Sequence, residues 1–143
     1  MPSVFVDGSP VADPTDSALV ANEITRRLGA LAELGFVGAI YLEQESLNFH
    51  LDIYGYGNFD GNIYAVLVED SVHFDTPPGT NGETEFFASM RRLVDLGTLS
   101  LIRGQHIEKT SSFPFAGSSL DKFSIIVFAQ KSSKEVIQSA SFK

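Results

Sequence analysis

In the stretch Leu47-Asn48-Phe49-His50-Leu51-Asp52-Ile53, apolar and polar side chains alternate strictly. Successive side chains of a β-strand point to opposite faces of the sheet, so this stretch predicts a strand with one face in a core and the other in water. Similar patterns predict strands at residues 36–43, 63–70, 98–109, 123–130 and 135–142. Turns rich in Gly, Asn and Ser separate them, a spacing typical of an Ig-like antiparallel β-sandwich.

The first 35 residues have a different pattern. Residues 4–11 predict a β-hairpin, because Asp7-Gly8 supplies the positive φ angles of a tight turn. A helix is expected over residues 13–34, with Asp13 as its N-cap and Gly35 at its end. Its apolar stripe contains Leu19, Val20, Ile24, Leu28 and Leu31. We therefore expect an N-terminal unit at residues 1–35 and a β-sandwich at residues 36–143.

One segment inside the expected sandwich follows a helical rather than a strand pattern. Residues 83–95 place Phe86, Phe87, Met90, Leu93 and Val94 at spacings of three and four. This spacing predicts a short amphipathic helix inserted between the strands.

The composition excludes several classes of function. The chain has 143 residues, 18 of them acidic and 10 basic, which gives a formal charge of −8. Phosphate backbones would be repelled, so no nucleic-acid partner is expected. The absence of cysteine excludes thiol chemistry within the chain. The sequence contains neither a run of 18 apolar residues nor the features of a signal peptide, so direct membrane insertion is not expected.

Besides the histidines, two groups of residues are candidates for binding. Tyr54, Tyr56 and Phe59 alternate with glycines and could form an aromatic platform for a sugar or a peptide, although aromatics at a strand end also close cores. The pair Arg91–Arg92 could hold a carboxylate or phosphate, or simply face solvent beside its acidic neighbours.

The histidines offer the remaining candidate chemistry. His73 lies near Asp70 and Asp75, so it could act as a base or a metal ligand, although these are also ordinary polar positions at a strand end. His50 and Asp52 share one strand face, which a solvated face explains as well as a metal does, and His106 is interpreted as a solvated strand residue. No Gly-x-Ser-x-Gly elbow is present, so a Ser/His/Asp hydrolase is not expected. With no convincing ligand spacing among the histidines and carboxylates, we predict no catalytic residue, metal or cofactor.

Several segments in order resemble the C-terminal part of secreted bacterial proteins of the thioredoxin-like outer-membrane lipoprotein type. They are residues 1–8, 63–70, 85–92, 125–130 and 134–140. The resemblance implies a thioredoxin-like domain followed by a β-sandwich, with Pro2, the hairpin and the first helix as a remnant of the thioredoxin-like domain. It also implies a periplasmic or cell-surface location for the parent protein. The chain departs from the family because it has no Cys-x-x-Cys.

These observations predict a non-catalytic interaction or positioning module rather than an enzyme. A homodimer through the N-terminal helix is expected, because the apolar stripe of that helix needs a partner. Two alternatives remain open. One is a carbohydrate- or peptide-binding module that uses Tyr54, Tyr56 and Phe59, with a protein or a glycan as partner. The other is a small hydrolase or metal enzyme around His73.

Overall fold

A computed structural model describes residues 3–115 and 119–143. Within these residues the chain forms one helix and nine strands, which are, in order, β1 (Phe5–Val6), β2 (Ser9–Pro10), α1 (Ser17–Leu28), β3 (Leu34–Glu43), β4 (Ser46–Gly55), β5 (Phe59–His73), β6 (Glu85–Leu101), β7 (His106–Pro114), β8 (Phe123–Gln130) and β9 (Val136–Phe142).

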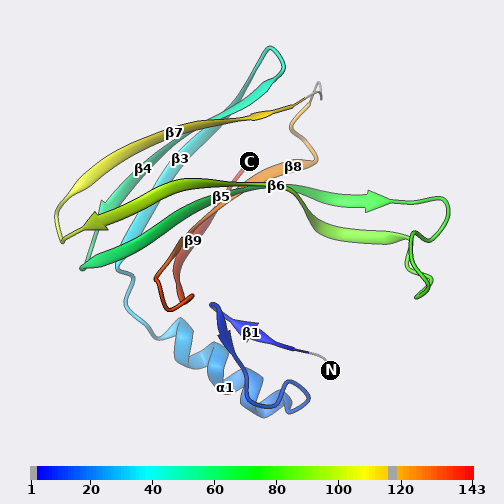
Figure 1. The fold of residues 1–143 in the computed structure, drawn as a ribbon, viewed down its shortest axis with the longest axis horizontal. Coiled ribbons are helices and arrows are strands. Elements are labelled where there is room, and N and C mark those ends of the chain that lie inside the picture. Colours follow the sequence, from blue (N-terminus) through cyan, green and yellow to red (C-terminus); the bar gives the residue numbers. More distant parts are fainter. Residues whose placement is uncertain (1–2, 116–118) are drawn as a thin grey trace.

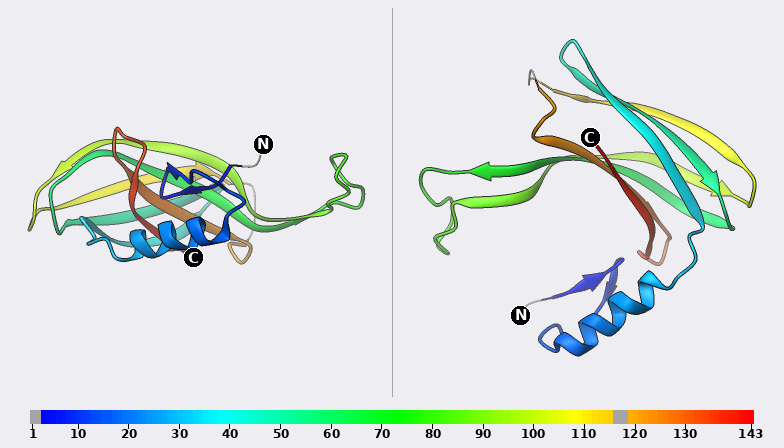
Figure 2. Two further views of the ribbon diagram at one scale, coloured as in Figure 1. Left: turned by 90° about the horizontal axis from the view of Figure 1, so that it is seen from below. Right: turned by 180° about the vertical axis from the view of Figure 1, so that it is seen from behind.

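Seven of the strands make two antiparallel sheets that face each other (Figure 1; Figure 2). One sheet has the order β3-β4-β7 and the other β6-β5-β8-β9. The predicted mainly β, antiparallel sandwich is therefore confirmed. β6 is the fourth of the seven sandwich strands and pairs with β5 in the larger sheet. In an immunoglobulin constant domain the fourth strand belongs instead to the sheet that contains the first and second strands.

The alternation in β4 positions the core as expected. Leu47, Phe49, Leu51 and Ile53 are buried, while Asn48, His50 and Asp52 remain partly exposed. The Phe49 ring stacks on Phe113 of β7, with ring centroids 5.8 Å apart. The larger sheet completes the core with apolar side chains that include Ile63, Ala65, Leu99, Ile125 and Val127.

The expected helix at residues 83–95 is wrong, because this segment belongs to β6 and pairs with β5. Two irregularities explain the misleading pattern. Arg91 is an extra residue opposite the step from Leu67 to Val68, and Ala88 has a positive φ of 51°. Such bulges shift the side-chain alternation, so apolar residues fall at spacings that imitate a helix.

Much of this hairpin extends beyond the rest of the sandwich (Figure 1). We call residues 71–91 the β5–β6 arm. Its side chains are largely exposed; Phe87, for example, is 73% exposed.

The strand expected at residues 98–109 is interrupted. β6 ends at Leu101 and β7 begins at His106, and the turn between them carries the chain from one sheet to the other. Gly104 has a φ of 88°, which permits this turn. The turn is fixed to β4, because Gly55 N donates to Gln105 O at 2.9 Å and Gly104 N donates to Gly55 O at 2.8 Å.

The N-terminal hairpin is confirmed, with φ of 48° at Asp7 and 79° at Gly8. The helix is shorter than expected at both ends. Asp16, not Asp13, is the N-cap and accepts from the Ala18 and Leu19 amides. The Asp13 carboxylate is instead bonded within its own turn, to the amide and hydroxyl of Thr15.

The helix ends at Gly29 rather than at Gly35, which lies in β3 and is buried. Residues 30–33 are thus a link to the sandwich and not a last helical turn. Pro2 lies outside the described residues.

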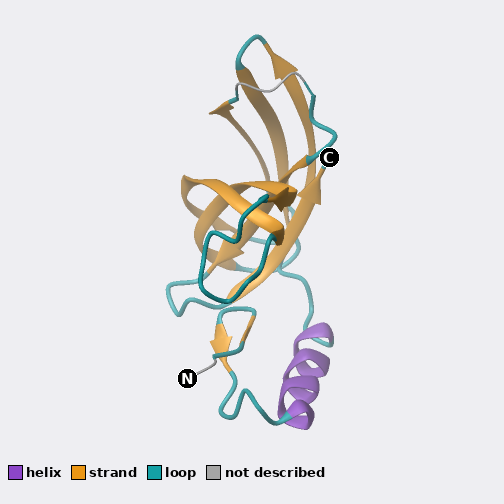
Figure 3. Ribbon diagram, turned by 90° about the vertical axis from the view of Figure 1, so that its right-hand side faces the viewer, coloured by secondary structure: helices purple, strands orange, loops and turns teal. Residues whose placement is uncertain are grey.

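The hairpin and α1 sit at one end of the sandwich (Figure 3). Asp7 O accepts from Val136 N at 2.8 Å, Arg27 forms an ion pair with Glu135, and Lys131 Nζ lies 2.5 Å from Glu33 Oε1. These are polar contacts with the turn between β8 and β9 and the start of β9. Within the described residues, no helix is both long and apolar enough to cross a membrane.

Candidate functional site

The helix α1 turns a polar face toward the rest of the chain. Glu23 and Arg27 are half-buried, and Arg27 Nη2 donates to Ser9 Oγ of the hairpin at 2.6 Å. None of the twelve residues of α1 is fully buried. Ile24 and Leu28, one turn apart, are 43% and 82% exposed. Of the predicted apolar stripe, Val20 is half-buried, whereas Leu19, Ile24 and Leu28 are exposed, as is Leu31 beyond the end of the helix.

Charge pairing fixes this polar face. Arg26 Nε donates to Glu23 Oε2 at 2.8 Å, and Arg27 Nε donates to Glu23 Oε1 at 3.1 Å. These hydrogen bonds stabilise the carboxylate and lower the pKa of Glu23 to about 2. The same carboxylate raises the pKa of both guanidinium groups.

A cleft of about 280 Å³ opens between the end of α1 and β9. Leu28 and Leu31 line one side of it and Ile137 the other. Glu33 contributes a carboxylate whose Oε2 is buried and has no hydrogen-bond partner among the described residues. The cleft continues the uncovered side of α1 into the sandwich. We call Ile24, Leu28, Leu31 and this cleft the α1 surface.

A second depression, of about 340 Å³, lies at the junction of β4 and the β6–β7 turn. It is lined by Tyr54, Gly55, Tyr56, Arg103, Gly104 and Gln105. We call it the tyrosine depression. The structure thus brings together two of the three aromatics predicted as a platform. Phe59 does not join them, because it starts β5 with its ring in the core, so its predicted binding role is wrong.

The backbone around the tyrosine depression is closely packed. The Tyr56 ring lies over Gly35 of β3, where an added Cβ would be 2.6 Å from the phenolic oxygen. At Gly55 an added Cβ would lie 2.2 Å from the carbonyl oxygen of Ile102. Arg103 Nε donates to the Tyr56 carbonyl at 3.0 Å. These contacts hold the turn and the tyrosines in one arrangement.

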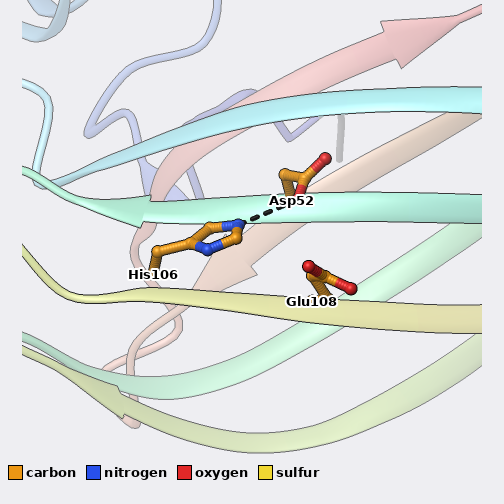
Figure 4. A group of neighbouring side chains, drawn as sticks. All are labelled: Asp52, His106 and Glu108. Atoms are coloured by element: carbon orange, nitrogen blue, oxygen red, sulfur yellow. Dashed lines mark hydrogen bonds and ion pairs between the residues drawn. The ribbon is translucent and has the colours of Figure 1, made fainter.

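Next to this depression, on the outer face of the smaller sheet, lies a cluster of charged side chains (Figure 4). His106 Nε2 is 2.8 Å from Asp52 Oδ1, and His50 Nε2 is 3.5 Å from Asp52 Oδ2. Glu108 lies directly opposite Asp52 in the register of β4 and β7. The His106 ring also stacks on Tyr54 at a centroid distance of 4.6 Å.

The other predicted site residues do not form a common site. His73 Nδ1 is 3.8 Å from Glu85 Oε1, and both side chains are exposed. Asp70 instead forms an ion pair with Lys143, so the structure does not assemble the suggested cluster of His73 with Asp70 and Asp75.

Arg91 lies on the β5–β6 arm, where its Nη2 is 2.5 Å from Glu69 Oε2. Arg92 is the exposed residue that follows, opposite Leu67 of β5. The first arginine of the pair is thus already neutralised by a carboxylate of its own sheet.

Sequence reasoning missed Arg103, Gln105 and Glu108. The sequence pattern predicts one continuous strand through Arg103 and Gln105. It therefore does not place these two residues in a turn beside Tyr54. The meeting of Asp52 with Glu108 depends on the β4–β7 register. A single sequence gives no signal for that register, because the two residues are far apart along the chain.

No protein-family model matches the chain, and no curated protein sequence matches it. Solved structures share its fold. HBP35 of Porphyromonas gingivalis aligns with a TM-score of 0.64 at 10% identity, over 87% of this chain and 45% of that one. Spo0M, a sporulation control protein from Bacillus subtilis, aligns with a TM-score of 0.51 at 9% identity, over 78% of this chain and 46% of that one. The chain thus spans less than half the length of either structure.

Proposed function

We propose that this chain is a non-catalytic interaction module of an extracytoplasmic protein that also contains a thioredoxin-like unit. The order of sequence segments that resembles thioredoxin-like outer-membrane lipoproteins supports this proposal. So does the fold shared with a part of the longer HBP35 chain. In this proposal the β-sandwich is the rigid body, and the N-terminal unit carries the contact surface.

The observation that carries the proposal is the orientation of α1. Its Arg27 contacts Ser9 of the hairpin and Glu135 next to β9, while Ile24 and Leu28 are exposed. A helix that stabilises a single domain normally places its apolar stripe toward the core. The opposite orientation favours a partner that covers the apolar side.

The partner that we propose is a second copy of the chain. Ser17–Leu28 contains one acidic and two basic residues, whereas the whole chain has a charge of −8. Two copies therefore meet at α1 without the repulsion that most of their surface would bring. Ile24 and Leu28 lie one turn apart, so a two-fold axis between the helices allows each pair to contact its symmetry mate.

Sedimentation equilibrium of the chain at tens of micromolar tests this proposal. We expect dimers, and we expect monomers from the double variant Ile24→Glu with Leu28→Glu. The matched control is Ala18→Glu with Asn22→Glu, which adds the same charges at the same spacing to exposed positions of α1 and leaves the dimer intact. A monomeric unmodified chain, or a dimer that withstands the first double variant, would contradict the proposal.

A second candidate function is carbohydrate binding at the tyrosine depression. Tyr54 and Tyr56 line one cavity with Arg103 and Gln105, and this combination of aromatic and polar side chains suits a sugar. A glycan array probed with the labelled chain tests this function, with Tyr56→Ala as the variant that loses binding. Tyr41→Ala, at another exposed tyrosine of the same sheet, is the control. An empty array, or a ligand that both variants retain, would exclude the depression as a sugar site.

A further inference from the structure

We propose that Asp52, His106 and Glu108 form a binding site for a divalent metal ion of the zinc class. The three residues lie on the outer face of the β3-β4-β7 sheet, on neighbouring strands (Figure 4). One ligand atom from each lies within 4.8 Å of the others. This site is separate from the α1 surface, and its test does not depend on the dimer.

The distances suit a small ion. Zinc binds imidazole nitrogen and carboxylate oxygen at about 2.0–2.2 Å, so two ligand atoms in a tetrahedral site are about 3.3 Å apart. His106 Nε2 and Asp52 Oδ1 are at 2.8 Å, and Glu108 completes a group that spans at most 4.8 Å. The three side chains are half-buried or exposed, so they have room to rotate toward an ion.

The backbone beneath the site is rigid. Asp52 lies on β4, the central strand of its sheet, between Leu51 and Ile53, which are both fully buried. Glu108 is its direct partner on β7. The second carboxylate oxygen of Asp52 is 3.5 Å from Nε2 of His50, so a further histidine stands beside this ligand.

The charges on this face favour a bound cation. Two carboxylates that are directly opposite each other on paired strands repel, and this repulsion destabilises the pairing of β4 with β7. Beside Asp52 on β3 stands Val37, which brings no compensating charge. A divalent ion between Asp52 and Glu108 would remove the repulsion and use His106 Nε2 as its nitrogen ligand.

The ligand set indicates which metal class would bind. One imidazole and two carboxylates suit zinc and similar first-row ions, whereas calcium and magnesium require about six or more oxygen ligands. Three protein ligands leave a coordination position for water or another small ligand, as in open zinc sites.

Titration calorimetry with zinc chloride on the chelator-treated chain at neutral pH tests the proposal. We expect one ion per chain and an affinity at least tenfold lower in His106→Ala and in Glu108→Gln. The matched control is His73→Ala, which removes another exposed histidine that faces a carboxylate and leaves zinc affinity unchanged.

A direct measurement keeps the test independent of any folding defect in these variants. In the unmodified chain, zinc should shift the NMR signals of the His106 ring and leave those of His73 in place. No heat of binding with no shift at His106, or equal binding by His106→Ala and the unmodified chain, would overturn the proposal.

Discussion

Replacement of Phe49 by Ala tests the assignment of the core face of β4. The Phe49 ring is buried between the two sheets and stacks on Phe113. Its strand, β4, is hydrogen-bonded to β3 on one side and to β7 on the other. Truncation of a buried Phe to Ala costs about 3–5 kcal/mol of unfolding free energy. A domain of this size is stable by only about 5–15 kcal/mol, so the loss is large but need not unfold the chain.

Urea denaturation followed by circular dichroism measures this cost. With a denaturant slope of about 2 kcal/mol/M, a loss of 4 kcal/mol lowers the midpoint by about 2 M. His50→Ala is the matched control, because His50 is the next residue of the same strand but points outward, 3.5 Å from Asp52. Its cost should be within about 0.5 kcal/mol, as for other partly exposed positions.

A double-mutant cycle with Phe113→Ala separates the stacking of the two rings from the cavity. We expect a coupling energy of about 0.5–1.5 kcal/mol between the two positions. If Phe49→Ala cost less than His50→Ala, the strand register would be wrong by one residue and both faces of β4 would be exchanged.

Three further predictions address the turn, the helix and the chemistry. Gly55→Ala should lower the free energy of unfolding by about 1–3 kcal/mol or more in urea melts, because its Cβ would meet the Ile102 carbonyl at 2.2 Å; an unchanged midpoint would contradict this contact. The lowered pKa of Glu23 means that its contribution to stability is complete above about pH 4.5 and is lost as pH falls through about 2. The free energy of unfolding should therefore fall in that interval, and Glu23→Gln should remove this part of the pH dependence. In an insulin-reduction assay the chain should not exceed the buffer rate, because it has no cysteine.

The fold was predictable where a strand has one face in water. β4 alternates without interruption, so the strand and its buried face could be inferred from sequence. β6 could not, because the extra residue Arg91 and the positive φ of Ala88 break the alternation at positions that only the pairing with β5 defines. The end of α1 was predicted too late in the chain, because Gly29 is already the C-cap that the sequence pattern places at Gly35.

The candidate sites were less predictable, because they depend on contacts between distant segments. Tyr54 and Tyr56 were identified from their spacing, but Arg103 reaches them only through the turn that joins the two sheets. His106 was interpreted as a solvated residue, and it meets Asp52 only because nine residue pairs of β4 and β7 are in one particular register. Such a register is a property of the whole sheet and not of either strand.

We expect the β5–β6 arm to open more readily than the rest of the chain. In this arm β5 pairs with β6 but no longer with β8, and side chains such as Phe87 and Met90 are exposed. Few buried contacts resist separation of these two strands, so the amide protons of the arm should exchange with deuterium through local opening. The amides of β4 and of the first half of β5 should exchange only when the whole domain unfolds. Residues near the tip are therefore where a protease would first cut the folded chain.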